Sequence, residues 1–200
     1  VDVSNPKNPT LAGRYDTIAT GWDVRVDGSF AYVGAGYGGL EIIDVSDPTR
    51  PKFHGAYVDP NPAHRIDLDG SQVYVAGSRG LQVVDVSDPS APSRIGFSPL
   101  AFADDVDVSG NLAYVAARVG GLQVLDITDP ASPFPVGSAP PDFWTQGVRV
   151  LDGMAYAGDS HGSPLIYDVQ DPTAPQRRGQ GYGSWLMGVT ETMAFTGTSQ

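Results

Sequence analysis

The sequence predicts an all-β protein, a β-propeller whose four-stranded blades each span about 41 residues. Three observations predict this fold class. One motif recurs five times at nearly constant spacing, each copy contains short apolar segments between turn residues, and 25 Gly and 17 Pro among the 200 residues supply many turns. No segment with the period of an amphipathic helix is long enough to compete with these strands.

The repeated motif reads D-V-S-D-P-x-x-P, with small variations between copies. Its copies begin at Asp2, Asp44, Asp85, Asp126 and Asp168, so they lie 42, 41, 41 and 42 residues apart. An Ala-Tyr pair, or a close variant, and a Gly-Leu pair recur in the same phase, although Ser163-Pro164 replaces Gly-Leu in the fourth copy. Three signals in one phase indicate a repeat architecture.

The second copy illustrates how one blade is built. Residues 66–68 alternate between apolar and polar, and Asp69-Gly70 supplies the positive φ angles of a tight hairpin turn. Ser87-Asp88-Pro89 turns the chain again, because Asp and Ser bond the following backbone while Pro fixes φ. The strands expected in this copy are 66–68, 73–76, 81–86 and 94–97.

Three segments of the chain resemble the LVIVD repeat, which occurs in bacterial and archaeal cell-surface proteins and is thought to form β-propellers. They are residues 39–48 (GLEIIDVSDP), 80–89 (GLQVVDVSDP) and 121–130 (GLQVLDITDP). The resemblance extends over essentially the whole chain. It implies a scaffold that is extracellular or on the cell surface, and it implies little chemistry because the family has no single agreed activity.

The chain, residues 1–200, is expected to form one propeller domain with four complete blades at about 16–183. Residues 1–15 hold the end of a third strand and a fourth strand, whereas residues 184–198 hold a first and a second strand. Either these half-blades pair and close a five-bladed ring, which covers exposed strand edges, or the chain is a fragment of a larger propeller. The start at Val1, without Met and inside a repeat, favours a fragment or a processed product.

Composition excludes several classes of partner. The 12 basic and 23 acidic residues give a net charge of −11, which repels nucleic acid phosphates, and no local basic patch offsets it. No apolar run approaches the roughly 18–20 residues of a membrane-spanning helix, so we expect no nucleic acid partner and no direct membrane insertion by this segment. The lack of Cys excludes disulfides and thiolate sites. The oligomeric state stays open.

Segments that look like cofactor or catalytic sites are better explained by the repeat. Residues 34–39 satisfy G-x-G-x-x-G, but the equivalent residues of other copies form a strand-to-strand loop with no helix to hold a pyrophosphate. Residues 158–162 place Asp, Ser and His side by side in the same loop, where they cannot face one another as a triad. His54, His64 and His161 fall at different phases and offer no symmetric metal ring. The sequence therefore predicts no cofactor, no metal and no catalytic residues.

The candidate ligand-binding surface is the segment before each innermost strand, where a propeller gathers loops at one mouth of its channel. Scaffold positions stay alike because each blade poses the same packing problem, whereas these segments vary and contain all three Trp residues. Trp offers apolar area, and the polar side chains offer directional bonds. The predicted ligand-binding residues are Trp22, Asp23, His64, Arg65, Asp104, Asp105, Trp144, Gln146 and Trp185.

Three functions fit this pattern. The leading hypothesis is a non-catalytic surface or secreted propeller that binds a protein or glycan partner, since no paired catalytic set is visible. The alternative is a hydrolase, or a fragment of one, that uses the mouth carboxylates Asp23, Asp104 and Asp105 with His64, as paired carboxylates do in glycoside chemistry. The third is a purely structural spacer of a surface-anchored protein, in which the Trp residues only plug the channel.

Overall fold

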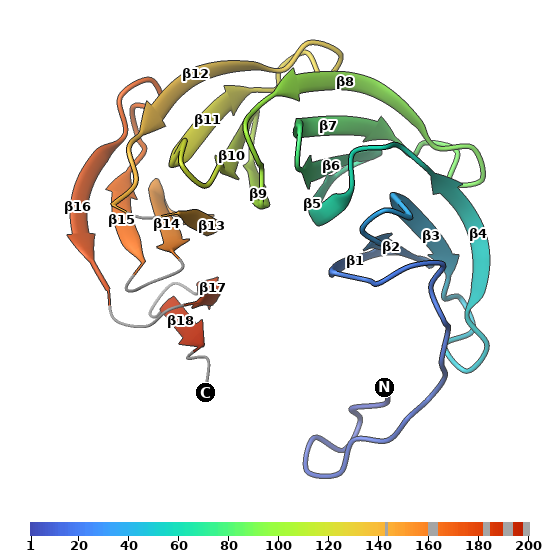
Figure 1. The fold of residues 1–200 in the computed structure, drawn as a ribbon. Helices are drawn as coiled ribbons and strands as arrows, with labels where there is room; N and C mark the ends of the chain where they lie inside the picture. The colour runs from blue at the N-terminus through green and yellow to red at the C-terminus, as the bar shows by residue number, and fades with distance from the viewer. Residues whose placement is uncertain (143, 160–163, 182–184, 190–193, 198–200) are drawn as a thin grey trace.

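The computed structural model describes residues 1–142, 144–159, 164–181, 185–189 and 194–197. These residues form strands and turns and contain no helix, so the prediction of an all-β protein is confirmed. They accordingly include no helix able to cross a membrane. The strands make four antiparallel sheets of four strands and one two-stranded hairpin. Figure 1 shows these sheets arranged as blades around an open arc.

Each blade consists of four consecutive strands. The first comprises β1 (Asp23–Asp27), β2 (Phe30–Gly34), β3 (Leu40–Asp44) and β4 (Lys52–Tyr57). The second comprises β5 (Ala63–Asp69), β6 (Gln72–Gly77), β7 (Gly80–Asp85) and β8 (Ser93–Pro99). The third comprises β9 (Asp105–Ser109), β10 (Leu112–Ala116), β11 (Leu122–Asp126) and β12 (Phe134–Ala139). The fourth comprises β13 (Thr145–Leu151), β14 (Met154–Asp159), β15 (Leu165–Asp168) and β16 (Gln176–Gln180), and the hairpin comprises β17 (Trp185–Val189) and β18 (Ala194–Gly197).

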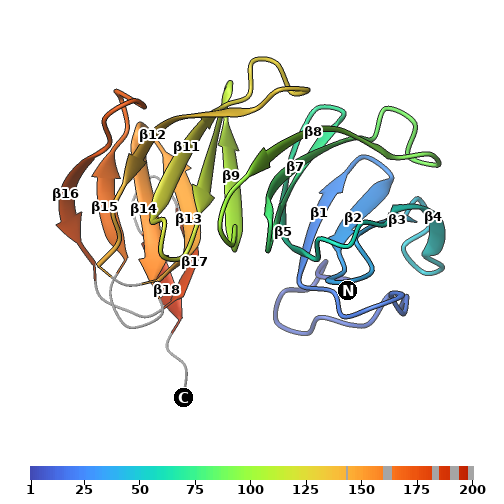
Figure 2. The same ribbon diagram turned by 45° about the horizontal axis from the view of Figure 1, so that its top comes forward.

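The first strand of each blade lies innermost, and the fourth lies on the outer rim (Figure 1). The turned view shows the sheets standing side by side around the arc (Figure 2). In the second blade, the observed strands coincide with the expected ones to within three residues. The predicted propeller architecture of four-stranded blades is therefore confirmed.

Neighbouring blades share hydrophobic cores. One cluster packs Tyr32, Leu40 and Ile42 of the first blade against Ile66 and Val84 of the second, and similar clusters join the second blade to the third and the third to the fourth. The middle strands are covered on both faces, which explains their almost continuous apolar sequences. Burial of one such Leu or Ile side chain stabilises the fold by about 1.5–3 kcal/mol, so each blade depends on its neighbours.

The repeated Asp residues organise the turn between the third and fourth strands. Asp44 Oδ1 accepts a hydrogen bond from the Ser46 N–H at 2.9 Å, and Asp47 Oδ1 accepts one from the Thr49 N–H at 3.0 Å. The same two bonds recur in the next three blades. The bonds from the Ser46 side chain and backbone lower the pKa of Asp44. The motif is a turn-forming device, as the sequence predicts.

A glycine in the fourth strand allows the turn of the next blade to approach closely. A Cβ on Gly55 would lie 2.2 Å from the carbonyl oxygen of Pro89, and a Cβ on Gly96 would lie 2.0 Å from that of Pro130. The third blade repeats this contact. At Gly179, the same position in the fourth blade, no described residue lies within 4 Å of the added Cβ.

Residues 1–15 and the hairpin of β17 and β18 lie apart (Figure 1). Residues 1–15 form one isolated bridge, between Asp2 and Thr10, instead of the expected strands. Gly13 in this segment nevertheless contacts the Pro48 carbonyl as the fourth-strand glycines do. The expected first and second strands of the last half-blade form as β17 and β18. Among the described residues no strand pairing joins residues 1–15 to this hairpin, so the closed five-bladed ring is not observed.

Candidate functional site at the channel mouth

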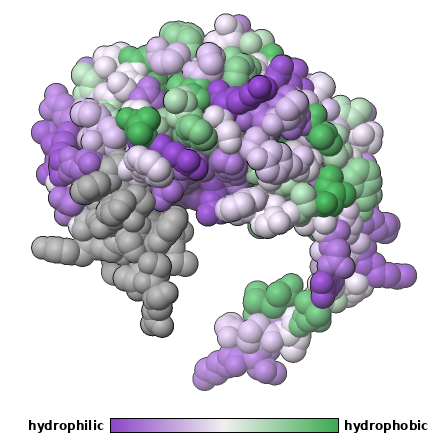
Figure 3. Space-filling view, in the orientation of Figure 1, coloured by the Kyte–Doolittle hydropathy of each residue, from purple (hydrophilic) through white to green (hydrophobic). Residues whose placement is uncertain are grey.

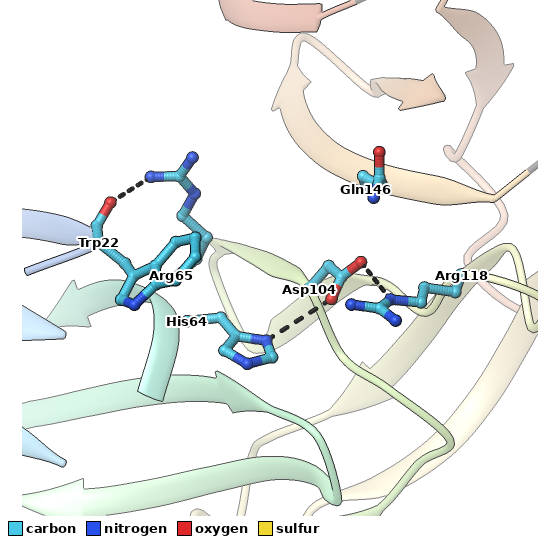
Figure 4. A pocket seen from close by; sticks show the side chains of 6 residues that line it. All are labelled: Trp22, His64, Arg65, Asp104, Arg118 and Gln146. Atoms are coloured by element: carbon cyan, nitrogen blue, oxygen red, sulfur yellow. Dashed lines mark hydrogen bonds and ion pairs between the residues drawn. The ribbon is translucent and has the colours of Figure 1, made fainter. Parts of the chain in front are cut away.

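A cavity of about 180 Å³ opens where the segments before the innermost strands meet. Four of its residues occupy the same position in successive repeats, as the strand registers establish. These are Trp22, His64, Asp104 and Gln146, and Arg65 and Arg118 complete the lining (Figure 4). The structure thus brings together five of the predicted binding residues, which come from four different blades.

Asp104 is the centre of the polar network in this cavity. Its Oδ2 accepts a hydrogen bond from Arg118 Nε at 2.6 Å, and its Oδ1 lies 3.5 Å from His64 Nδ1. Burial opposes ionisation of Asp104, but the bonds from His64 and Arg118 outweigh it and hold the pKa of the carboxyl below its usual range. At neutral pH, Asp104 is therefore a carboxylate that accepts hydrogen bonds.

The guanidinium of Arg118 packs against two aromatic rings. Its Cζ lies 4.7 Å from the ring centroid of Phe102 and 5.7 Å from that of Trp144, both within cation–π range. In Figure 4 the guanidinium points from the turn between β10 and β11 toward Asp104. The two rings and the carboxylate fix a side chain that would otherwise sample many rotamers.

The sequence prediction does not include Arg118, because its loop aligns with glycine-containing loops of the other blades. The Arg118 backbone has a φ of 41°, in the left-handed region where the first blade has Gly36 at 52°. A non-glycine residue is strained in this region. Two backbone hydrogen bonds with Thr145 of the next blade hold it there. The replacement of Gly36 of the first blade by Arg118 in the third is the sequence signal that could have identified it.

Two Trp rings flank the cavity and remain accessible. Trp22 is 55% exposed and Trp144 is 51% exposed. The Trp22 ring centroid lies 6.2 Å from that of His64, and the Trp22 carbonyl oxygen accepts a hydrogen bond from Arg65 Nη1. Trp22 and His64 also line a second hollow of about 250 Å³. The rings therefore present apolar faces beside the polar network.

Asp23 and Asp105 connect neighbouring blades. Asp23 Oδ2 accepts the backbone N–H of Ile66 at 3.1 Å, and Asp105 Oδ2 accepts that of Val148 at 3.0 Å. Each also accepts a hydrogen bond from an arginine of the innermost strands. Burial raises the pKa of Asp105, against the opposing effect of Arg149 and two backbone bonds. The structure places these two predicted ligand residues in inter-blade contacts rather than in the cavity lining, because their oxygens face the adjacent strand.

Gln146 and Trp185 complete the predicted set. Gln146 lines the cavity from β13, and its Oε1 is buried with no hydrogen-bond partner among the described residues. Trp185 begins β17, but its side chain lies outside the part of the chain that the structure describes. Within that part, no group of three or more His, Asp or Glu side chains is placed to hold a metal ion.

The sequence model of the LVIVD repeat matches residues 1–17, 20–59, 62–97 and 102–139. The chain belongs to the LVIVD repeat family. The matched LVIVD repeats contain Trp22, His64, Asp104 and Arg118, whereas Trp144 and Gln146 follow them in the sequence. No curated protein matches the chain in sequence.

Solved structures similar to these LVIVD repeats include two designed proteins. The computationally designed Ika8 protein has a TM-score of 0.66 and 10% identity, and the match covers 84% of this chain and 52% of that chain. The computationally designed Ika4 protein has a TM-score of 0.62 and 12% identity, with 80% and 98% covered. Identities this low show the fold alone. The chain spans about half the length of the Ika8 protein.

Figure 3 shows hydrophilic residues along part of the concave edge of the arc as well as on its outer rim. Within the cavity, Asp104 offers acceptor oxygens, Arg65 and Arg118 offer donors, and the ring of Trp22 offers apolar area. This combination can orient a ligand by directional bonds while an aromatic face covers its apolar side.

Proposed function

We propose that this chain is a non-catalytic β-propeller scaffold that binds a protein or glycan partner at the channel mouth. The observation that carries the proposal is the cluster in which Asp104 and Trp144 hold Arg118, beside the half-exposed ring of Trp22. The resemblance to LVIVD repeats of cell-surface proteins leads us to place this scaffold outside the cell, secreted or on the surface.

The cavity residues behave unlike scaffold residues. Scaffold positions repeat from blade to blade, whereas one position of the repeat contributes four different side chains to the cavity: Trp22, His64, Asp104 and Gln146. Arg118 adopts a strained backbone conformation, and such conformations cluster at functional sites. Apolar faces beside a few fixed polar groups are the usual composition of a ligand site.

A hydrolase at the same mouth is the second candidate. Glycoside hydrolysis uses a carboxylic acid of raised pKa together with a second, free carboxylate. In this chain His64 and Arg118 favour the ionised form of Asp104. Burial raises the pKa of Asp105, as a general acid requires, but Asp105 and Asp23 accept inter-blade hydrogen bonds and do not line the cavity. This distribution supports binding over catalysis. An Asp104→Asn change that abolished a hydrolytic turnover would instead favour the hydrolase.

A structural spacer is the third candidate. In a spacer, Trp22 and Trp144 would support only the fold, and replacing them would lower stability with no binding to lose. About half of each side chain is accessible to solvent, which favours a role in contacting a ligand.

A binding screen tests the proposal. The chain and its Trp22→Ala and Phe134→Ala variants are applied to a panel of glycans and peptides, with duplex DNA and anionic vesicles as negative probes. Phe134 is a matched control, because it is 54% exposed and lies on the outer strand β12. We expect saturable binding by the wild type and the control, weakened at least tenfold by Trp22→Ala. The proposal fails if no panel member binds saturably or if the control loses binding equally.

A further inference from the structure

We infer that the mouth cavity takes a glycan that carries a carboxylate, a terminal hexuronic acid, with its carboxylate on Arg118 and its sugar ring against Trp22, while Arg65 adds a second positive charge to the lining. This inference rests on the proposed function and adds the chemical class of the ligand. It follows from the charge of the cavity, the fixed geometry of Arg118 and the size of the hollow.

The residues that line the cavity include two arginines, Arg65 and Arg118, and one carboxylate, Asp104. Asp104 pairs with Arg118, whereas Arg65 donates Nη1 to the backbone carbonyl of Trp22 and has no ion-pair partner among the described residues. Among the nearby carboxylates of the innermost strands, Asp23 and Asp67 share Arg25, and Asp105 pairs with Arg149. Burial raises the pKa of Asp105, and the charge of Arg65 is among the effects that oppose this rise. Arg65 therefore keeps N–H donors that no described carboxylate takes up in an ion pair, and guanidinium groups bind carboxylates through paired N–H donors.

Arg118 is oriented before any ligand arrives. Its Nε is engaged by Asp104, Phe102 and Trp144 cover its guanidinium, and no described residue accepts a hydrogen bond from its terminal nitrogens. A side chain held in this way loses little conformational entropy on binding. Its terminal N–H groups are the fixed donors that a ligand carboxylate needs.

The size and walls of the cavity favour a sugar over a peptide. About 180 Å³ is less than the roughly 300–1,000 Å³ of pockets that enclose drug-sized molecules, so the cavity suits one ring-sized group. A pyranose has an apolar C–H face for the ring of Trp22 and in-plane hydroxyls for Asp104 and His64. The net charge of −11 repels long polyanions, which favours a single terminal carboxylate over a polyacidic chain.

The inference is tested with matched ligands. Disaccharides ending in glucuronate or galacturonate are compared with those ending in glucose or galactose, and hexaglutamate is the peptide probe. We expect at least one acidic disaccharide to bind tenfold more tightly than its neutral counterpart. Arg65→Gln and Arg118→Gly should each reduce this preference at least fivefold. Arg50→Gln, at an exposed turn, is the control and should leave the preference unchanged.

Arg118→Gly suits the local backbone because Gly36 adopts the same conformation in the first blade. Arg65→Gln tests the inference independently if Arg118→Gly does not fold. Equal affinity for acidic and neutral disaccharides overturns the inference but leaves the proposed function standing. Tighter binding of hexaglutamate than of any disaccharide also overturns it, in favour of an acidic peptide. Failure of every probe, here and in the panel, contradicts the proposed function itself.

Discussion

Gly96 faces the carbonyl oxygen of Pro130 so closely that a Cβ at this position would lie 2.0 Å from it. The contact joins β8 of the second blade to the turn of the third blade. We therefore expect Gly96→Ala to force the blades apart and to lower the free energy of unfolding by about 1–3 kcal/mol, as overpacking does. Denaturant unfolding of the wild type and the variant measures this difference.

Gly179 is the matched control, because it occupies the same repeat position in β16 with no described residue within 4 Å of an added Cβ. Gly179→Ala should leave stability unchanged or raise it by up to about 1 kcal/mol, since alanine restricts the unfolded chain. A loss at Gly179 as large as at Gly96 would contradict the open arc. It would favour the alternative in which the turn near Asn5 and Pro6 packs on β16 and closes the ring.

Asp105 holds the third blade to the fourth. Asp105→Ala removes the acceptor of the Val148 N–H and leaves Arg149 without its partner. We expect a loss of roughly 3 kcal/mol, because breaking a buried pair leaves an uncompensated charge. Asp142→Ala breaks an exposed pair with Arg177 and should cost less than about 1 kcal/mol. Chemical denaturation measures the loss of stability in each variant. Equal losses would show that Asp105 does not stabilise the contact between the third and fourth blades.

Asp107 makes stability depend on pH. Burial raises the pKa of Asp107 to about 6; the Val150 N–H and Arg149 oppose this, while Asp67 and Asp105 add to it. The folded chain therefore keeps this proton up to about pH 6, whereas the unfolded chain releases it near 3.8. Asp107 thus lowers the free energy of unfolding as pH rises from about 4 to about 6.

Asp107→Asn should remove this contribution while keeping an acceptor for the Val150 N–H. Relative to the wild type, the variant should be similarly stable near pH 4 and more stable at pH 7, by on the order of 1–3 kcal/mol. Thermal melts across this pH range measure the difference. Asp27→Asn, at the exposed end of β1, is the surface control measured beside Asp107→Asn. A constant offset between Asp107→Asn and the wild type at every pH would disprove the titration.

The fold could be predicted from the repeat because the spacing of the motif and the residues of its turns depend only on neighbouring parts of the sequence. The Asp69-Gly70 and Ser87-Asp88-Pro89 turns bound β5 to β8 as expected. Ring closure was not predictable in the same way, because it depends on contacts between chain ends that no local signal encodes. The role of the fourth-strand glycines was also hidden, since the residue that approaches Gly96 lies one repeat further along.

The residues of the channel mouth could be predicted because the same repeat position of every blade lies near the channel. Trp22, His64 and Asp104 occupy this position and line one cavity. Two features of the site could not be predicted from the sequence. Asp105 follows Asp104 directly, yet alternation along the strand turns its oxygens toward Val148, 43 residues away. Arg118 lies 14 residues after Asp104, in the turn that follows β10, and the antiparallel pairing of β9 with β10 brings it beside Asp104.

The chain contains three Trp residues, and the indole N–H signals of Trp22 and Trp144 would report on ligand binding at the proposed mouth site. Two-dimensional ¹⁵N–¹H spectra, with signals assigned by Trp→Phe variants, would follow a titration with the tightest ligand of the panel. We predict that the signals of Trp22 and Trp144 shift together and saturate at the affinity measured by binding. Saturable binding that leaves both of these signals unmoved would contradict the assignment of the mouth cavity as the binding site.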